Sequence, residues 1–521
     1  MFDSMASALR HNAHKFANKT AIYYQEREIS FAEHLKRCER VAAGLAALGL
    51  KKQDRVAVMC QNRPEFLEIY GAGELAGYII ATVNFRLAAA EVEGILRSSE
   101  PKVVFFEDQY SDIFSELKEK LDFVEHFICI GEAPAWSEQY ERFLPATAAA
   151  VTAAIAPDDI LHLIFTSGTT GKPKGAMRSH RAEACAAELL ATELGLNIDD
   201  RLQLMMPMFH VGARWLQMAA QMRGAAIVLH YRFDPPEVIK EMERSRVTMT
   251  HMAPTMVQMV LDTPDIDRYD LSSLHTVCYS AAPMPVPLLK RGVNKFGKVF
   301  LQLYAMTESA GGTTLHRHQH ILDGSEKEMA RLGSIGQAAR GVEVRIVDDA
   351  GNPVPLGEPG EIAVKNDAIM SGYWNNSIAT IGVLRDGWYL TGDMGRMDED
   401  GFVYLVDRKK DMIISGGENV YSREVEEAIA SHPAIADCAV MGIPDPKWGE
   451  AVHAVVVCAK GLSVSEEELI AHCRTLIANY KKPRSVAFVD ALPRLASGKI
   501  DKKQLRQETR AALAAVAGTQ G

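Results

Sequence analysis

Short apolar runs alternate with longer helical patterns along the first three hundred residues. Residues 55–60 (RVAVMC) and 102–106 (KVVFF) have the character of buried strands, and residues 65–81 between them follow a helical pattern. This alternation builds β-α units and favours an α/β body whose ligand-binding loops lie where the strands end. The same rhythm predicts strands in five further apolar segments, which are residues 161–166, 225–231, 248–254, 274–280 and 299–305.

The pattern changes after about residue 333. Short strands with tight turns, such as residues 360–366, predict a β-rich subdomain that ends near Asp407. We therefore predict two domains, a large α/β N-terminal domain over residues 1–407 and a small α+β C-terminal domain over residues 408–521. The small domain takes its helices and strands from residues 422–432, 437–444, 451–458 and 465–480 and from a final strand.

Composition narrows the class of protein. The chain has 521 residues, of which 47% are hydrophobic, and its net charge is -10. This length buries more than one core, and the acidic balance disfavours attraction to nucleic acid or anionic membranes. The eight cysteines show no paired spacing, and no apolar run approaches the length of a membrane span. We predict a soluble cytoplasmic protein with no nucleic-acid partner and no membrane insertion.

One loop carries the strongest chemical signal in the sequence. Residues 166–175 (TSGTTGKPKG) follow a predicted strand and combine glycines, hydroxyls and lysines in ten positions. Glycines permit close backbone approach, hydroxyls donate hydrogen bonds and lysines supply positive charge, so the loop predicts phosphate binding. The fingerprint of P-loop kinases and ATPases does not fit, because proline follows Gly171-Lys172 and Gly168 lies too near. The candidate ligands are Thr166, Ser167, Gly168, Thr169, Thr170, Gly171, Lys172 and Lys174.

This loop resembles the phosphate loop of the adenylate-forming superfamily, which includes acyl-CoA synthetases, firefly luciferase and peptide-synthetase adenylation domains. Further motifs of the superfamily follow in order and span most of the chain. They are residues 304–308 (YAMTE), 389–393 (YLTGD), 407–411 (DRKKD), 415–420 (SGGENV) and 495–500 (LASGKI).

The resemblance implies an ATP site in the large domain. By it, Glu308 helps to hold Mg²⁺ on the ATP phosphates and Thr307 hydrogen-bonds a phosphate oxygen. A carboxylate suits Mg²⁺ as a hard oxygen ligand. The residues implied around the nucleoside are Tyr304, Ala281 and Ala282 near the adenine, and Asp393 and Arg408 at the ribose.

The resemblance also implies a mobile small domain that serves two half-reactions. Lys499 is the implied catalytic lysine of adenylation, because a positioned ammonium stabilises charge on the phosphoryl oxygens. Lys410 is the implied hinge about which the small domain rotates. Gly416 and Gly417 then leave a passage for the pantetheine of coenzyme A, and Trp448 resembles a tryptophan that contacts coenzyme A in aryl-acid ligases.

The acyl pocket is less well defined by the sequence. His210, in residues 208–212 (MFHVG), resembles the family residue that gates the pocket near the carboxylate and is grouped with the catalytic residues. Four further residues are candidates for lining the cavity, namely Arg214, Trp215, Gly311 and Gly312. Phenylpropenoate-type aromatic acids and medium or long fatty acids both remain candidate substrates.

The predicted function is therefore an AMP-forming acyl-CoA synthetase that converts a carboxylic acid, ATP and coenzyme A into acyl-CoA, AMP and pyrophosphate. One alternative is an adenylating enzyme that loads a carrier protein, and a more distant one is a phosphoryl-transfer kinase. Their products and requirements differ, since only the first needs free coenzyme A and only the kinase releases ADP. A homodimer is compatible with the sequence.

Three other sequence patterns partly match known binding motifs. Residues 71–76 (GAGELA) match a relaxed dinucleotide fingerprint but lie inside a helical pattern, so we assign them to helix packing. Residues 316–320 (HRHQH) lack a carboxylate or cysteine complement and favour a solvated loop over a metal site. Residues 398–401 (DEDG) lack the distal ligands of a calcium loop and predict a β-turn.

Overall fold

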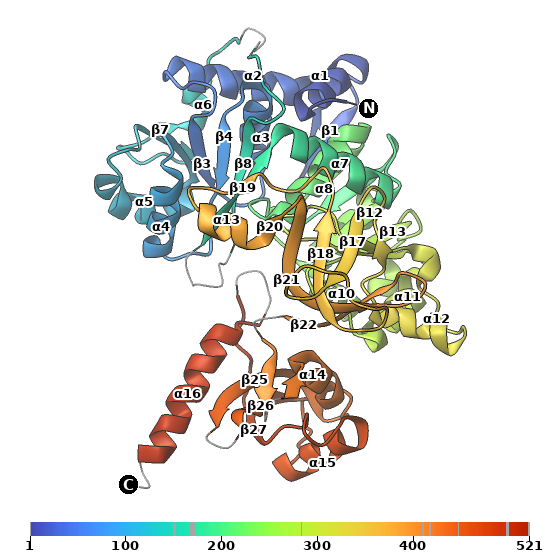
Figure 1. Cartoon of the computed structure of the whole chain (residues 1–521). Coiled ribbons are helices and arrows are strands. Elements are labelled where there is room, and N and C mark those ends of the chain that lie inside the picture. The colour runs from blue at the N-terminus through green and yellow to red at the C-terminus, as the bar shows by residue number, and fades with distance from the viewer. Residues whose placement is uncertain are drawn as a thin grey trace. The chain divides into compact units, whose positions relative to one another are not determined.

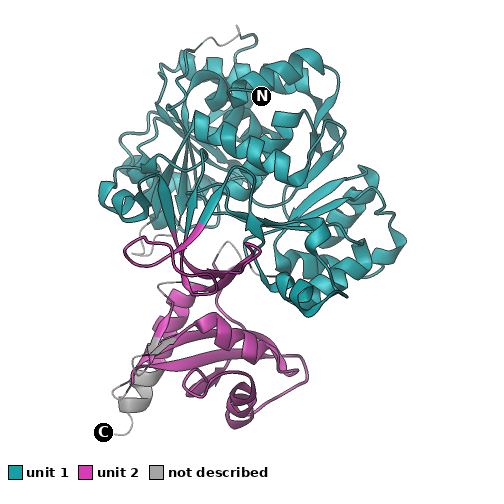
Figure 2. Ribbon diagram, turned by 45° about the vertical axis from the view of Figure 1, so that its right-hand side comes forward, with its two compact units in different colours: residues 1–344, 363–390 teal, residues 345–362, 391–521 magenta. Residues whose placement is uncertain are grey.

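The chain divides into two compact units. The first comprises residues 1–344 with 363–390, and the second comprises residues 345–362 with 391–521 (Figure 2). The computed structural model describes eight ranges, residues 2–148, 153–166, 173–282, 284–408, 411–415, 418–445, 448–495 and 500–518. The predicted domain division at residue 407 stays a prediction.

An eight-stranded sheet of the first unit is mainly parallel (Figure 1). Its order is β19-β9-β8-β4-β3-β5-β6-β7, and β9 runs antiparallel to both of its neighbours. The strands are β3 (Arg55–Met59), β4 (Ile79–Thr82), β5 (Val103–Glu107), β6 (His126–Ile130), β7 (Glu138–Gln139), β8 (Ile160–Thr166), β9 (Lys174–Ser179) and β19 (Gly372–Tyr373).

A nine-stranded sheet of the same unit has the order β16-β15-β14-β13-β12-β10-β11-β1-β2. The pairs from β14 to β1 are parallel, so the carboxyl ends of these strands meet at one edge, where α/β sheets usually bind ligands. The strands are β1 (Thr20–Tyr24), β2 (Arg27–Ser30), β10 (Arg201–Leu204), β11 (Ala226–Leu229), β12 (Met249–Met252), β13 (Thr276–Tyr279), β14 (Phe300–Tyr304), β15 (Thr313–Leu315) and β16 (Gln337–Ala338).

Helices α3, α7 and α8 share one hydrophobic core with strands of both sheets. Representative members are Ile69 of α3, Leu190 of α7 and Trp215 of α8, with Ile80 and Ile227 from the two sheets. The helices of the first unit are α1 (Met5–Lys15), α2 (Phe31–Ala47), α3 (Pro64–Ala76), α4 (Ala89–Ser99), α5 (Ser111–Leu117), α6 (Tyr140–Phe143), α7 (His180–Leu194), α8 (Val211–Arg223), α9 (Pro235–Arg244), α10 (Pro254–Leu261), α11 (Val286–Phe296), α12 (Glu326–Ala330) and α13 (Ser377–Val383).

Helix α3 shows where the sequence pattern needs correction. The predicted helical segment 65–81 is a helix followed by a strand, because Gly77 takes a left-handed φ of 73° at the helix end and β4 begins two residues later. The glycines of residues 71–76 serve helix packing, as predicted. A Cβ on Gly71 would lie 2.3 Å from the Cys38 sulfur, so a side chain there would collide with α2.

The second unit contains most of two smaller sheets. One has the order β17-β18-β21-β20, with β22 on β21, and the unit boundary passes within β17, β18 and β21. The other has the order β24-β23-β26-β25, with β27 on β26. The strands are β17 (Glu343–Val347), β18 (Gly360–Lys365), β20 (Leu384–Arg385), β21 (Trp388–Met397), β22 (Val403–Arg408), β23 (Ile413–Ser415), β24 (Glu418–Val420), β25 (Ile435–Asp445), β26 (Gly449–Cys458) and β27 (Ser485–Phe488), and the helices are α14 (Ser422–Ala430), α15 (Glu466–Leu476) and α16 (Lys502–Gly518).

The predicted fold class is confirmed, with a large α/β part, a β-rich part and a small α+β part. The turn at residues 398–401 is also confirmed, because the Gly401 N–H donates to the Asp398 carbonyl over 3.0 Å. The solvated loop predicted at residues 316–320 is wrong for His320, which is 1% exposed and lies 3.0 Å from the Tyr279 hydroxyl. Across the described residues, the helices are too short or too polar to cross a membrane.

Candidate active site

The predicted phosphate loop joins two antiparallel strands of the first unit. Strand β8 ends at Thr166 and β9 begins at Lys174, and these two residues face each other in the register. Lys174 therefore belongs to a strand rather than to the loop. Six predicted phosphate ligands lie outside the described residues, and they are Ser167, Gly168, Thr169, Thr170, Gly171 and Lys172.

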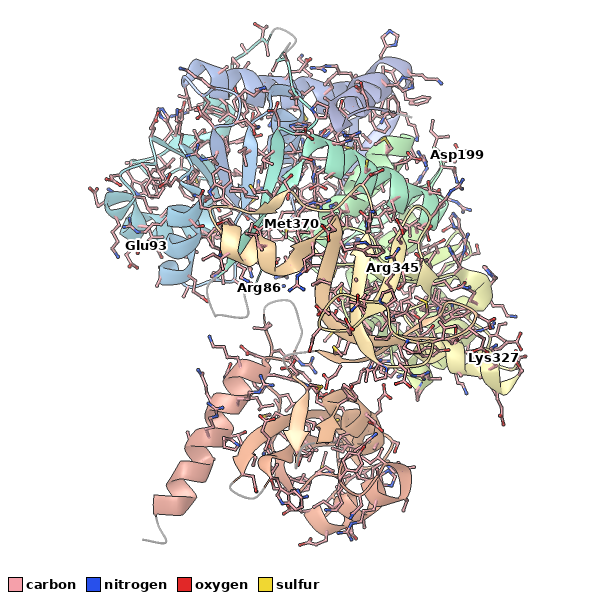
Figure 3. The ribbon with its side chains drawn as sticks, in the orientation of Figure 1. Arg86, Glu93, Asp199, Lys327, Arg345 and Met370 are labelled. Atoms are coloured by element: carbon pink, nitrogen blue, oxygen red, sulfur yellow. The ribbon has the colours of Figure 1, made fainter. Side chains whose placement is uncertain are left out.

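A buried carboxylate lies beside the base of this loop. Glu308 is 6% exposed, and its Oε1 accepts a hydrogen bond from the Tyr373 hydroxyl over 2.8 Å. Thr166 Oγ1 lies 3.4 Å from the same oxygen. The Glu308 main chain is also held, because the N–H of Met370, labelled in Figure 3, donates to its carbonyl over 2.8 Å. The predicted metal ligand and a predicted phosphate ligand thus come together in the structure.

Tyr373 is a site residue that the sequence does not predict. It lies beside Glu308 because β19 pairs with β9, placing Tyr373 opposite Ala176, and the Lys174 ammonium lies 5.1 Å from its ring centre. Burial and the neighbouring Glu308 carboxylate raise the pKa of Tyr373. The hydroxyl therefore stays protonated at neutral pH and can donate to Glu308. We name the Glu308, Tyr373, Thr166 and Lys174 group the carboxylate cluster.

The carboxylate cluster fits a hard divalent cation such as Mg²⁺. Glu308 presents carboxylate oxygens, and neighbouring hydroxyl oxygens lie at hydrogen-bonding distance. No group of three or more His, Cys, Asp or Glu side chains in the described ranges could hold a metal ion by itself. A cation at Glu308 would therefore need oxygen ligands from a phosphate or from water, which is the usual way that Mg²⁺ binds in nucleotide sites.

The residues predicted near the adenine lie at the ends of neighbouring strands. Tyr304 ends β14, and Ala281 and Ala282 follow β13 with exposed side chains. Gly312 allows Tyr304 to pack closely, because a Cβ at Gly312 would lie 2.6 Å from the Tyr304 carbonyl oxygen. Thr307, predicted to bind phosphate, lies half-buried in the turn directly before Glu308.

The two residues predicted at the ribose are cross-strand partners in the second unit. Asp393 of β21 lies opposite Arg408 of β22 in the antiparallel register. Asp393 is 8% exposed, and its N–H donates to Thr391 Oγ1 over 3.1 Å. Strand pairing therefore fixes the spacing of these two backbones, while the side chain of Arg408 lies outside the described set.

Four residues predicted to act in the small domain lie outside the described residues, and they are Lys410, Gly416, Gly417 and Lys499. Their flanking segments are anchored within the second unit. Asp407 Oδ1 accepts from the Ser422 hydroxyl over 3.0 Å, and Asp411 pairs with Arg506 over 2.7 Å.

Trp448 carries a stacked arginine. The Arg484 guanidinium carbon lies 4.0 Å from the Trp448 ring centre, and Arg484 Nε is buried without a hydrogen-bond partner among the described residues. Burial, together with the positive charges of Arg474 and Arg484, lowers the pKa of Lys482. This part of the second unit therefore concentrates positive charge, which is a setting suited to an anionic ligand.

His210 caps helix α8, and its Nδ1 accepts a hydrogen bond from the Gly212 N–H over 3.3 Å. The prediction that Arg214 lines the acyl cavity is wrong. Arg214 is 1% exposed and pairs with Glu74 over 2.5 Å. Trp215 also faces the core and donates to Glu183 over 2.7 Å.

The two glycines predicted to open the acyl cavity make room for protein side chains. A Cβ at Gly311 would lie 2.8 Å from Leu189, and one at Gly312 would lie 2.9 Å from the Tyr304 ring. Close packing therefore accounts for both positions without a ligand.

Comparison with known proteins identifies the family. Residues 9–374 match the family model described as AMP-binding enzyme, and residues 424–499 match the AMP-binding enzyme C-terminal domain. A feruloyl-CoA synthase of Amycolatopsis sp is 37% identical over 489 residues, covering 94% of this chain and 95% of that protein. A long-chain-fatty-acid–CoA ligase of Mycobacterium tuberculosis is 36% identical over 484 residues, covering 92% of this chain and 93% of that protein.

Solved structures agree with this assignment. The structure of ATP-bound MatB from Rhodopseudomonas palustris superposes with a TM-score of 0.86 and 29% identity, covering 96% of this chain and 98% of that chain. The family matches together span most of the chain, in the order that its motifs predict. The chain therefore belongs to the AMP-binding enzyme family and is an acyl-CoA synthetase of the adenylate-forming superfamily.

Proposed function

We propose that this acyl-CoA synthetase activates a fatty or phenylpropenoate-type acid with MgATP at the carboxylate cluster and transfers the acyl group to coenzyme A. The observation that supports this most is the burial of Glu308 beside Thr166, at the base of the glycine-rich loop. Phosphates in the loop would bring their metal ion to that carboxylate. Lys174 adds a positive charge on the same strand pair.

In the first half-reaction the acid's carboxylate oxygen attacks the α-phosphorus of ATP, and pyrophosphate leaves with the electrons of the broken P–O bond. The product is a mixed anhydride of the acid and AMP. Negative charge grows on the phosphoryl oxygens during attack, and a nearby ammonium lowers the free energy of that transition state. We assign this role to Lys499, and the ribose contacts to Asp393 and Arg408. When bound, Mg²⁺ supplies charge neutralisation on the phosphates.

In the second half-reaction the thiolate of coenzyme A attacks the adenylate carbonyl, and AMP leaves. Lys499 and an incoming thiol need different faces of the adenylate, so we propose that the small domain, residues 408–521, turns about Lys410 between the steps. Gly416 and Gly417 would then border the pantetheine. The Trp448 and Arg484 stack, with the positive charge around it, supports a site for the nucleotide part of coenzyme A.

The acid is proposed from the relatives and from the residues beside His210. The named relatives act on ferulate and on long-chain fatty acids, which are the two classes left open by the sequence. His210 lies at the first turn of α8, on the carboxyl-end edge of the nine-stranded sheet. We propose that His210 gates the acyl pocket.

A product screen tests the proposal. Purified protein is incubated with MgATP and acids of aromatic, short-chain, medium-chain and long-chain type, with and without coenzyme A, and AMP, ADP, pyrophosphate and thioester are measured. We expect AMP, pyrophosphate and thioester in equal amounts with at least one aromatic or longer-chain acid. ADP as the product, or AMP formation that yields no thioester when coenzyme A is present, would contradict it.

A further inference from the structure

A buried histidine lies behind the turn that carries Ala281 and Ala282. His251 belongs to β12 and is 3% exposed, and its Nε2 lies 2.7 Å from the Ser280 hydroxyl. In the parallel register His251 faces Cys278, two residues before Ser280, so these side chains share one face of the sheet. The histidine therefore reaches the first residue after β13 from the strand beside it.

The ring is held in a confined space. A Cβ placed on Gly212 would lie 3.8 Å from His251 Cε1 and 3.7 Å from His210 Nδ1, so the first turn of α8 closes against both rings. His251 Nδ1 is buried and has no hydrogen-bond partner among the described residues. Burial, and secondarily His210, lowers the pKa of His251 to about 4, so the ring is neutral at physiological pH. Among the described residues, the neutral imidazole of His251 therefore forms one side-chain hydrogen bond, with Ser280.

The residue after Ser280 has an unfavourable backbone. Ala281 has a φ of 71°, in the left-handed region that a residue with a Cβ rarely adopts. Such a conformation persists only where the surroundings hold it, and it is found preferentially at ligand sites. Ser280 is half-buried and Ala281 is exposed, so the anchored residue lies on the protein side of the turn and the strained residue faces outward.

We propose that His251 is a positioning residue for the nucleotide, which acts through Ser280 to hold Ala281 in its left-handed conformation beside the adenine. The inference rests on the proposed function for the placement of ATP. Loss of either hydrogen-bonding partner frees the turn to relax toward negative φ. ATP binding must then restore the left-handed conformation of Ala281, which costs free energy, and the affinity for ATP falls.

The test measures the dissociation constant of MgATP by titration calorimetry in the full chain, without acid or coenzyme A. We expect His251→Leu and Ser280→Ala each to raise it about tenfold, the effect of losing one buried hydrogen bond. The double variant should show no further rise, because both changes remove the same anchor.

The decisive step is rescue by glycine. Ala281→Gly placed in the His251→Leu chain should return the dissociation constant to within about threefold of the wild-type value, because glycine adopts positive φ without steric cost. Ala281→Gly alone should raise it by about twofold, through added flexibility of the free turn. A structural defect elsewhere in the molecule would not be repaired by glycine at this one position.

His230→Leu is the matched control. It removes a half-buried histidine, whose Nε2 lies 2.9 Å from Gln203 Nε2, without touching the turn, and should leave ATP binding within about twofold of wild type. Should His251→Leu fail to fold in a thermal melt, Ser280→Ala with and without Ala281→Gly makes the same test.

An unchanged ATP affinity, additive effects of the two anchor variants, or no rescue would overturn the inference. Failure of the proposed function is separate, since it would appear as wild-type protein that forms neither acyl-adenylate nor thioester.

Discussion

The carboxylate cluster of the first unit and the Trp448 and Arg484 stack of the second unit organise charge in different ways. Glu308 is buried, accepts from a tyrosine, and has its main chain fixed by Met370. Arg484 instead lies over an indole, and its charge and that of Arg474 lower the pKa of Lys482. The first site is therefore built around one carboxylate with fixed geometry, whereas the second offers positive charge for a flexible anionic ligand.

This difference predicts which substitutions act on the chemical step and which act on binding. Changes that touch the reacting phosphate should lower a rate by large factors. Changes at the stack should raise a KM by a small factor, because a contact that is equally strong in the ground state and the transition state contributes to binding alone.

The largest effect is expected at Lys499. Lys499→Ala should lower the rate of adenylate formation by about 100-fold or more, because one charged donor to the transition state is lost. Thioester formation from supplied acyl-adenylate should continue. Rapid-quench measurement of the two half-reactions checks this, with Lys503→Ala, a nearby exposed lysine, as the control. Equal losses in both half-reactions would refute the assigned role.

The hinge should show the opposite pattern. Lys410→Pro fixes φ and should lower thioester formation by about 50-fold while adenylate formation stays within about threefold of wild type. Lys410→Ala removes the charge but leaves φ free, so it separates a requirement for charge from a requirement for rotation. If adenylate formation falls as far as thioester formation, the change has damaged the domain rather than blocked its turning.

A smaller effect is expected within the carboxylate cluster. Tyr373→Phe removes the 2.8 Å hydrogen bond to Glu308 and should raise the KM for MgATP about tenfold, because the carboxylate loses a donor that orients it. Steady-state kinetics at varied ATP and Mg²⁺ measure this. Tyr404→Phe, which removes a hydroxyl bonded to Asp398 over 3.2 Å, is the matched control. An unchanged KM would exclude Tyr373 from the metal and phosphate site.

The smallest effect is expected at the stack. Arg484→Ala should raise the KM for coenzyme A about fivefold and leave adenylate formation unchanged, since the loss is one cation-π contact and one charge. Arg396→Ala, which removes a guanidinium 4.6 Å from the Tyr404 ring centre, is the control. If Arg484→Ala and Arg396→Ala have the same KM for coenzyme A, the Trp448 and Arg484 stack does not contribute to the coenzyme A site.

The sequence predicts the motifs at residues 166–175 and 304–308 well, because each lies where a predicted strand ends. Thr166 and Glu308 were predicted from separate motifs, and the structure brings them to 3.4 Å. Tyr373 escaped prediction because its role depends on β19 pairing with β9 about two hundred residues earlier in the chain. No local pattern around Gly372-Tyr373 reveals that partner.

Arg214 and His320 show a second limit. The sequence makes Arg214 a candidate for the acyl cavity, where it could meet a polar tail of the acid, and it places His320 in a polar segment that favours a solvated loop. Arg214 is buried because Glu74 on another helix neutralises it, and His320 because Tyr279 bonds its ring. Such pairings are long-range and cannot be inferred from the spacing of residues in one segment.

The most direct test of the central claim is ATP–pyrophosphate exchange. Wild-type protein is incubated with MgATP, labelled pyrophosphate and an acid that gives AMP in the product screen, without coenzyme A. Reversible formation of an acyl-adenylate predicts label in ATP that depends on the acid, and conversion to thioester when coenzyme A is added. Absence of exchange under conditions where coenzyme A still drives AMP release would contradict the adenylate account.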